Sequence, residues 1–169
     1  MLRELHKELG IPASYAQDNG LPTYGEPAEL VDVGPNLVGR MQRLTSDVAQ
    51  QWQAMTAAAA QDGIELLIVS GFRSVEYQAA LIRSKIEAGQ VIDDILKVNT
   101  APGFSEHHTG QAVDIATPGS RPLTEEFEAS AAFEWLQRRA QEFGFSMSYP
   151  RENPWGISYE PWHWAIKER

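Results

Sequence analysis

The sequence predicts an α+β fold in which a small central antiparallel sheet is flanked by helices. Helical and strand-like patterns are mixed along the chain without the regular strand–helix–strand alternation of a parallel sheet. The chain also has no glycine-rich phosphate loop between a strand and a helix, which argues against a doubly wound fold. The predicted strands are short, and "QAVDIA" and "PWHWAIK" alternate between their two faces as strands do.

Length and composition fit one folded domain. The chain has 169 residues, of which 43% are hydrophobic and 22% are charged, and a chain of this size can bury one core. We divide it into an N-terminal segment over residues 1–35, rich in Gly, Pro and polar residues, and a main domain over residues 36–169. The N-terminal segment is expected to wrap the domain in an extended form, with a short helix at residues 2–8.

Charge and cysteine content exclude several classes of protein. The net charge is −9 and the pI is about 4.9. This argues against a surface that binds nucleic acid and against a polybasic segment that binds anionic lipid. The chain contains no cysteine, so it has neither a disulfide nor a thiolate zinc site. Any metal must therefore be held by nitrogen and oxygen.

The N-terminal residues "MLRELHKELGIPASYAQ" lack the apolar stretch of a secretory signal, and no run of 18 apolar residues occurs. We therefore expect a cytoplasmic protein without a membrane span, and a monomer. If the chain is part of a longer exported protein, the periplasm is expected instead.

The first long periodic segment predicts a helix over residues 36–61. Its apolar residues recur at steps of three and four, which gives a helix one apolar face, and Gly63 ends the pattern. These residues are Leu37, Met41, Leu44, Val48, Trp52, Met55 and Ala59.

The following segments predict a strand and a second helix. The run from Ile64 to Val69 is apolar with one charge, which favours a buried strand. Ser74 is a suitable N-cap for a helix over residues 75–88, which Gly89 ends. Residues 99–110 are expected to form a loop.

The C-terminal half predicts three strands and one helix. In "QAVDIA", Val113 and Ile115 face one way, while Asp114 shares the other face with two alanines. Ser130 is a suitable cap for a helix, "FGFSMS" predicts a strand, and "PWHWAIK" predicts another strand that turns its tryptophans away from His163. The apolar stripe expected on the helix is Phe133, Leu136, Ala140 and Phe143.

Four potential metal ligands lie in the predicted strands "QAVDIA" and "PWHWAIK" and in the loop before "QAVDIA". Catalytic zinc sites use three protein ligands and keep one position open, and the candidates are His107, His108, Asp114 and His163. Asp114 and His163 each lie on a strand face beside alanines, which leaves room over both side chains. The fourth histidine, His6, is expected to face solvent in the N-terminal segment.

Glu160 lies three residues before His163 and is followed by Pro161, which keeps it out of the helical backbone region. We therefore expect a bend at Glu160 that turns its carboxylate toward the metal side, where a carboxylate serves as a general base.

Each of these features also has an ordinary structural explanation. The histidine pair is typical of an exposed loop, and Asp114 of a turn or cap. His163 between two tryptophans fits a core strand, Glu160 a solvated acid, and Arg73 a surface ion pair. Their joint occurrence in one small domain favours a functional site.

These residues resemble a known family, the VanY-type D-alanyl-D-alanine carboxypeptidases. The resemblance rests on the spacing Ser105-x-His107-x-x-Gly110-x-Ala112-x-Asp114 and on Glu160-x-x-His163 near the C-terminus. It also includes "SGFRSVEYQ" at residues 70–78, which is similar to the family's arginine motif, and it spans about residues 36–166. The family belongs to the zinc-peptidase group that includes lysostaphin-like enzymes and the hedgehog signalling domain, so the resemblance implies a hedgehog-like peptidase fold.

The resemblance implies a role for each matching position. His107, Asp114 and His163 would bind Zn²⁺, which selects His107 over His108, and Gly110 would allow a tight turn. Glu160 would be the general base and later the acid, and Arg73 would stabilise the oxyanion or orient the scissile carbonyl. Gln78 and Ser105 would bind the C-terminal residue of the substrate and its carboxylate.

The implied function is a zinc-dependent carboxypeptidase that removes the C-terminal D-alanine from peptidoglycan stem peptides or muropeptides, in cell-wall metabolism or muropeptide recycling. Both D,D- and L,D-carboxypeptidases occur in the family, and a cytoplasmic location would favour L,D activity. Two alternatives stay open: a lysin-like peptidoglycan endopeptidase with the same metal site, and a non-catalytic, zinc-containing muropeptide-binding module. The presence of Glu160 and Arg73 argues against the binding module, because binding alone needs no general base.

Overall fold

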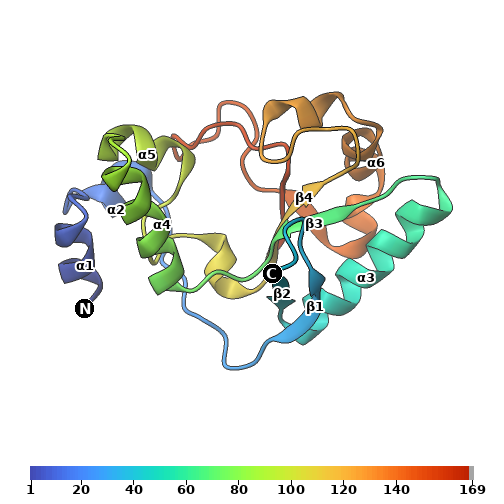
Figure 1. Cartoon of the computed structure of the whole chain (residues 1–169), viewed down its shortest axis with the longest axis horizontal. Coiled ribbons are helices and arrows are strands. Elements are labelled where there is room, and N and C mark those ends of the chain that lie inside the picture. The colour runs from blue at the N-terminus through green and yellow to red at the C-terminus, as the bar shows by residue number, and fades with distance from the viewer. Residues whose placement is uncertain (168–169) are drawn as a thin grey trace.

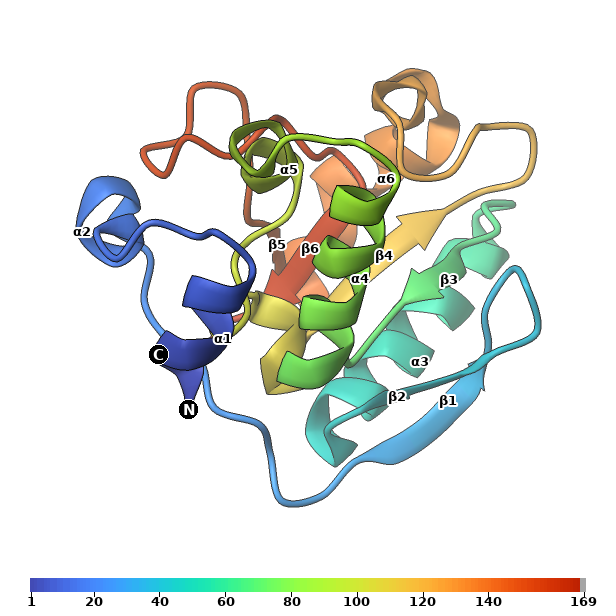
Figure 2. The same cartoon turned by 60° about the vertical axis from the view of Figure 1, so that its left-hand side comes forward.

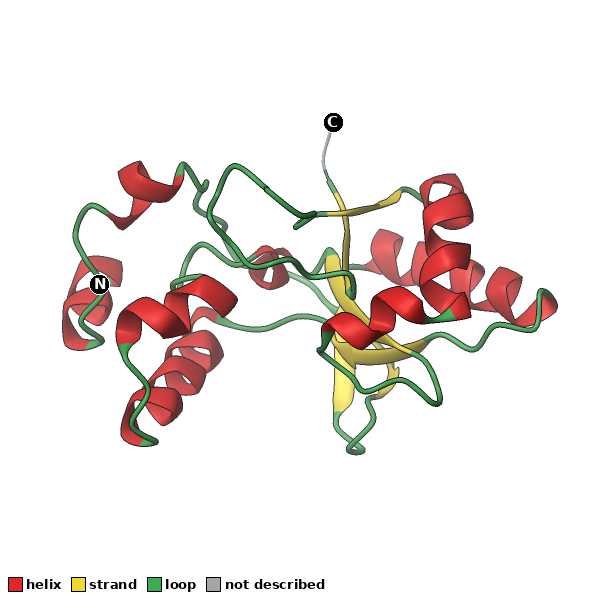
Figure 3. Cartoon of the chain, turned by 90° about the horizontal axis from the view of Figure 1, so that it is seen from above, coloured by secondary structure: helices red, strands yellow, loops and turns green. Residues whose placement is uncertain are grey.

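The computed structural model describes residues 1–167, and its elements form two groups (Figure 1). Residues of both groups line one cavity. One group holds the strands with helices α3 and α6, and the other holds α1, α2, α4 and α5, as the view from above also shows (Figure 3). The helices are α1 (Leu2–Glu8), α2 (Tyr15–Asn19), α3 (Ser46–Gln61), α4 (Val75–Glu87), α5 (Ile92–Val98) and α6 (Ala131–Arg139), with the short 3₁₀ helices η1 (Glu106–Thr109), η2 (Glu125–Ala129) and η3 (Ala140–Phe143). The strands are β1 (Val31–Pro35), β2 (Met41–Leu44), β3 (Leu67–Ser70), β4 (Ala112–Ala116), β5 (Phe145–Met147) and β6 (His163–Ile166).

A four-stranded antiparallel sheet in the order β3-β4-β6-β5 carries the site (Figure 2). In the register of β4 and β6, Asp114 lies directly opposite His163. Directly opposed side chains on one face of an antiparallel pair lie close together. The α+β fold with a small antiparallel sheet is therefore confirmed, and the register explains how two residues 49 positions apart meet.

The other face of this sheet packs against α3 and α6 to form the larger hydrophobic core. Val113, Ile115 and Trp164 are buried in it, whereas Asp114 and His163 point to the opposite face. The predicted alternation of both strands is thus confirmed. The helices contribute Val48, Trp52, Met55, Ala59, Phe133, Trp135 and Leu136 to the same cluster.

A second hydrophobic cluster joins the N-terminal segment to α4 and α5. Leu9, Ile11, Tyr15 and Leu21 are buried against residues that include Ile82. The N-terminal segment contains the expected helix at residues 2–8, but it also contains α2 and supplies part of a core. It is therefore more deeply integrated than an extended wrap.

Two predicted helix caps are present. The hydroxyl of Ser74 accepts a hydrogen bond from the Tyr77 N–H at 2.9 Å at the start of α4. The hydroxyl of Ser130 accepts one from the Phe133 N–H at 3.1 Å at the start of α6. Each cap satisfies an N–H group that has no partner within the helix.

The prediction of one helix over residues 36–61 is wrong in its first part. Residues 31–44 form the β1–β2 hairpin, and α3 begins only at Ser46. The side-chain oxygen of Asn36 accepts hydrogen bonds from the Val38 and Arg40 N–H groups, and Gly39 has a φ of +81°. This local turn chemistry outweighs the apolar spacing, and Met41 is 54% exposed.

Smaller differences concern element ends and one helix. Helix α5 was not predicted, η1 lies within the expected loop at 99–110, and the strand expected from Ile64 begins at Leu67. Within residues 1–167, no helix combines the length and apolar character needed to cross a bilayer. The division at residue 35, the cytoplasmic location and the monomeric state stay predictions.

Candidate active site

All seven predicted site residues line one cavity of about 510 Å³ between the sheet and α4. Loops and strands of the sheet contribute one wall, and α4 with the segment after α5 contributes the other. The seven residues are Arg73, Gln78, Ser105, His107, Asp114, Glu160 and His163. The fold thus brings together residues that span positions 73 to 163 of the chain.

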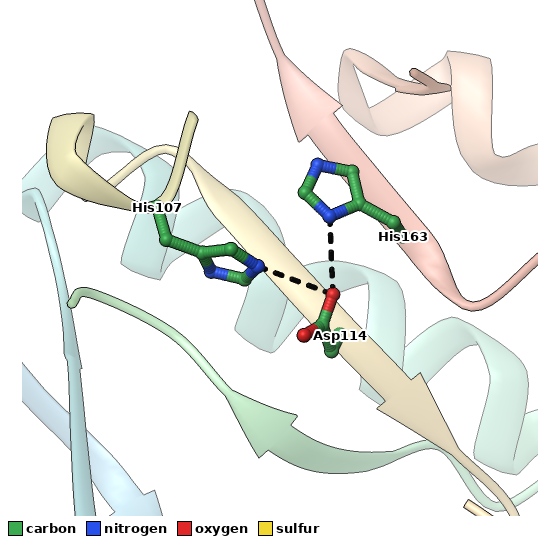
Figure 4. Close-up of side chains that lie close together, drawn as sticks. All are labelled: His107, Asp114 and His163. Carbon is green, nitrogen blue, oxygen red and sulfur yellow. Dashed lines mark hydrogen bonds and ion pairs between the residues drawn. The ribbon is translucent and has the colours of Figure 1, made fainter. Parts of the chain in front are cut away.

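Three of these side chains form a compact group of potential metal ligands (Figure 4). The Oδ1 atom of Asp114 lies 3.2 Å from Nε2 of His107 and 3.1 Å from Nδ1 of His163. The three residues are buried, and their ligand atoms all lie within 4.8 Å of one another. Ligands about 2.0–2.1 Å from a tetrahedral zinc ion are about 3.3 Å apart, so these two contacts match the edges of a zinc tetrahedron.

The hydrogen bonding of His107 also favours a cation. Its Nδ1 lies 2.6 Å from the carbonyl oxygen of Gly71, so the proton of the neutral ring resides on Nδ1. Burial and the charge of Arg73 lower the pKa of His107 to about 4, which keeps the ring neutral. Its Nε2 then turns a lone pair toward a carboxylate oxygen, an arrangement that a metal ion between the two atoms would stabilise.

The far nitrogen of His163 lies within ion-pair distance of a residue that the sequence did not identify. Nε2 of His163 lies 3.4 Å from Oε1 of Glu106, and both side chains are buried. Although burial opposes ionisation, the contact with His163 lowers the pKa of Glu106 to about 2, so the carboxylate stays charged. Glu106 thereby directs Nδ1 of His163 toward Asp114.

Glu160 lies at the bend before β6, as predicted. Its Oε2 lies 3.7 Å from Nδ1 of His163, and the backbone N–H of His163 donates to the Glu160 carbonyl. Burial raises the pKa of Glu160 to about 7 against the opposing charge of His163, and the charge of Asp114 raises it further. A carboxylate with this pKa suits proton transfer near neutrality.

Arg73 is anchored on both sides of its guanidinium group. Its Nη2 donates to Oδ2 of Asp114 at 3.2 Å, and its Nη1 donates to Oε1 of Gln78 at 3.4 Å. The amide nitrogen of buried Gln78 donates in turn to the Thr100 carbonyl. Within residues 1–167, Nε of Arg73 is buried without a hydrogen-bond partner, so one donor of the guanidinium is unpaired.

Two glycines allow the loops around the site to approach other backbone. A Cβ atom at Gly71 would lie 2.7 Å from the Arg43 carbonyl oxygen. Gly110 has a φ of +68°, and a Cβ atom there would lie 2.8 Å from the side chain of Leu30. Gly110 thus forms the expected tight turn, and it does so against the N-terminal segment.

Ser105 and His108 lie next to the metal-ligand group in different roles. The hydroxyl of Ser105 accepts a hydrogen bond from the His107 N–H at 3.2 Å. His108 is fully buried; its Nε2 accepts from the Gly103 N–H, and its Nδ1 donates to the Arg73 carbonyl at 2.7 Å. It therefore fixes the backbone of Arg73 and lies outside the group of ligands.

The prediction that His6 faces solvent is wrong. Its Nε2 lies 2.7 Å from the carbonyl oxygen of Pro102 in a half-buried position, and its ring packs near Phe104. The N-terminal segment folds onto the loop before η1 and thereby covers this histidine.

Comparison with known proteins identifies relatives of the chain. The model of the VanY family, described as D-alanyl-D-alanine carboxypeptidase, matches residues 41–167. The Bacillus subtilis (strain 168) protein YodJ is 31% identical over 173 residues, which cover 96% of this chain and 58% of YodJ. The chain spans about half the length of the curated relatives that it matches.

Solved structures with the same fold include two peptidases of this kind. The LD-carboxypeptidase LdcB has a TM-score of 0.75 at 31% identity, covering 86% of this chain and 71% of that chain. The vancomycin resistance D,D-pentapeptidase VanY, in complex with Zn(II), has a TM-score of 0.62 at 27% identity, covering 84% and 82% of the two chains. Each of these likenesses extends over more than four fifths of this chain.

Proposed function

Because the chain belongs to the VanY family of D-alanyl-D-alanine carboxypeptidases, we propose that it is a zinc-dependent carboxypeptidase that releases D-alanine from the C-terminus of peptidoglycan stem peptides. The observation that carries this proposal is the buried group of His107, Asp114 and His163 beside Glu160 and Arg73 in one cavity.

His107, Asp114 and His163 would hold the zinc ion through Nε2, Oδ1 and Nδ1 respectively. When bound, zinc would supply a Lewis acid that polarises the substrate carbonyl and makes a water molecule more acidic. The three candidate ligand atoms are two nitrogens and one oxygen, and the oxygen lies 3.2 Å and 3.1 Å from the two nitrogens. Nitrogen and oxygen atoms are the donor set of catalytic zinc sites without cysteine.

Glu160 would accept the proton of the attacking water and pass it to the leaving amine. It lies on the cavity side of His163, and its raised pKa allows it to take and release a proton near neutral pH. Arg73 would stabilise the negative charge that develops on the carbonyl oxygen, because its guanidinium is fixed beside Asp114 before the substrate arrives.

Gln78 and Ser105 would contact the leaving D-alanine. Both are buried and line the cavity beside Arg73. Recognition of a terminal residue in this way would make the protein an exopeptidase. The likeness to the LD-carboxypeptidase LdcB at a TM-score of 0.75 favours L,D activity on tetrapeptides over D,D activity on pentapeptides.

The test uses defined tetrapeptide and pentapeptide muropeptides, with and without a chelator, and identifies the products by mass. We expect each substrate peptide to lose one alanine, and we expect no reaction after chelation. The Glu160→Gln variant should bind zinc fully but catalyse no reaction. The control is Glu134→Gln, which changes an exposed acid on α6, across the sheet from the cavity.

Other results would contradict the proposal in different ways. Separation of cross-linked dimers without alanine release would indicate an endopeptidase. Binding of muropeptides without any turnover by the zinc-loaded protein would indicate a binding module.

A further inference from the structure

One basic residue of the cavity has no role in the proposed reaction. Lys85 lies in the last turn of α4, and Gln78, Leu81 and Lys85 all line the cavity. Residues spaced three and four apart share one face of a helix, so this face of α4 carries a polar group at one end and a cation at the other. Lys85 and the metal-ligand group therefore line the same cavity.

The surroundings of Lys85 do not neutralise its charge. Within residues 1–167, no carboxylate forms an ion pair with Lys85, whereas Arg83 on another face of the same helix pairs with Glu8 at 2.9 Å. Arg73 is already engaged by Asp114 and Gln78. Within the described residues, Lys85 is thus a cation of the cavity that has neither an ion-pair partner nor a role in the proposed reaction.

The environment of Lys85 also disfavours its positive charge. Lys85 is half-buried, and burial together with the positive charge of Arg73 lowers its pKa. Leu81 and Val98 line the same cavity and offer no compensating charge. An anion bound beside Lys85 would offset this repulsion, since Asp114 is already engaged with Arg73.

We propose that Lys85 binds a carboxylate at the scissile end of the substrate, on the terminal D-alanine or on the diamino acid before it, in addition to the contacts made by Gln78 and Ser105. This inference rests on the proposed function, and it identifies the residue that sets which stem peptides are accepted. An ammonium group on a flexible stem can follow a carboxylate within the cavity, and a charged hydrogen bond that is partly shielded from water is strong.

A stem peptide carries a third carboxylate, on its γ-linked D-glutamate, and all the test peptides contain D-isoglutamine at that position, so that this carboxylate is absent. Two carboxylates then have the required chemistry. One is the terminal carboxylate of the leaving D-alanine. The other is the side-chain carboxylate of meso-diaminopimelate, which is absent when lysine is the diamino acid. Four peptides distinguish these two carboxylates. They contain either meso-diaminopimelate or lysine, and each ends in D-alanine as a free acid or as an amide.

The measurement is the dissociation constant of each peptide for the zinc-loaded Glu160→Gln protein, with and without Lys85→Met. Methionine keeps the apolar stem and removes the charge. We expect Lys85→Met to weaken binding about 10- to 100-fold for every peptide that carries the recognised carboxylate. Lys85→Arg should restore most of the affinity, and Lys97→Met is the matched control because Lys97 is exposed and pairs with Asp94.

The pattern of the loss identifies the source. A loss confined to free acids assigns Lys85 to the terminal carboxylate, and a loss confined to meso-diaminopimelate peptides assigns it to the side-chain carboxylate. Equal weakening of all four peptides, a change below about twofold for all of them, or no binding of any peptide to the Glu160→Gln parent would overturn the inference.

Turnover by the protein with Glu160 intact is measured separately. A Lys85-dependent binding pattern without turnover would contradict the proposed function and leave the inference standing. Turnover without that pattern would contradict the inference alone.

Discussion

Each histidine of the ligand group is fixed by a contact at its far nitrogen. The Gly71 carbonyl holds Nδ1 of His107, and the carboxylate of Glu106 lies beside Nε2 of His163. These contacts decide which nitrogen faces Asp114. Partners of this kind commonly matter almost as much for metal affinity as the ligands themselves.

We predict that Glu106→Gln lowers the zinc affinity about 10- to 100-fold. The amide keeps the size of the side chain and removes the charge that orients His163. Competition with a chromophoric chelator measures the affinity, and Glu134→Gln is the control. An unchanged affinity with an unchanged thermal midpoint would show that the Glu106 carboxylate has no part in metal binding.

Zinc binding should release about one proton from the metal-free protein near pH 7.5. Although burial disfavours a charged ring, contacts with Asp114 and Glu106 raise the pKa of His163 to about 10. The ring is therefore protonated at neutral pH and must lose the Nδ1 proton to bind a metal. The affinity should rise as the pH increases toward 10 and fall as it decreases.

Calorimetry in two buffers with different enthalpies of ionisation measures this proton release directly. His107 should contribute little, because its lowered pKa already leaves it neutral. Zinc binding without proton release at pH 7.5 would contradict the prediction.

The spacing of the motif residues predicted the group that the fold assembles, but it did not predict Glu106. Ser105, His107 and Asp114 occur at a spacing that carries information by itself. Glu106 is significant only because the pairing of β4 with β6 brings His163 to the loop before β4. A single sequence without that pairing contains no sign that one loop acid differs from its neighbours.

At the scale of elements, the N-terminal segment forms one wall of the second core. We predict that Ile11→Ala lowers the free energy of unfolding by about 2–4 kcal/mol, because Ile11 is 5% exposed and truncation leaves a cavity. Chemical denaturation measures the loss. The control is Val38→Ala at the tip of the hairpin, where the side chain is 77% exposed and little change is expected.

A loss below about 1 kcal/mol for Ile11→Ala would show that the N-terminal segment lies on the domain without stabilising it. The zinc affinity of this variant should stay close to that of the parent, since the three ligands lie on the sheet side of the cavity.

Elements were predicted correctly where the local backbone signals, such as caps and turns, agree with the apolar pattern that packs into the core. Ser74 and Ser130 begin helices because a capping hydroxyl and an apolar face occur together. Over residues 31–44 the two requirements differ: the spacing of Leu37 and Met41 suits a helix, whereas Asn36 and Gly39 form a hairpin turn. Turn chemistry decides the backbone there, because the exposed apolar residues gain little from burial.

For the whole molecule, the metal should couple the parts of the domain that meet at the site. A ligand that binds only the folded state stabilises it by about 2.7 kcal/mol at a free concentration 100-fold above its dissociation constant. We therefore predict that chelation lowers the thermal midpoint and that added zinc restores it. His107→Ala should lose this response to zinc, and an equal response in that variant would contradict the assignment of His107 as a ligand.

The position of β6 in the sheet has a consequence for the order of events during synthesis. In residues 1–167, β6 follows every other element, yet it lies between β4 and β5 and carries His163. A nascent chain that lacks β6 offers His107 and Asp114 alone, and β5 has no neighbour to pair with. Because domains emerge from their N-terminal side first, the proposed zinc binding would follow translation of β6. A bound ion would then indicate a completed sheet, and chains terminated before β6 would lack one of the three proposed ligands.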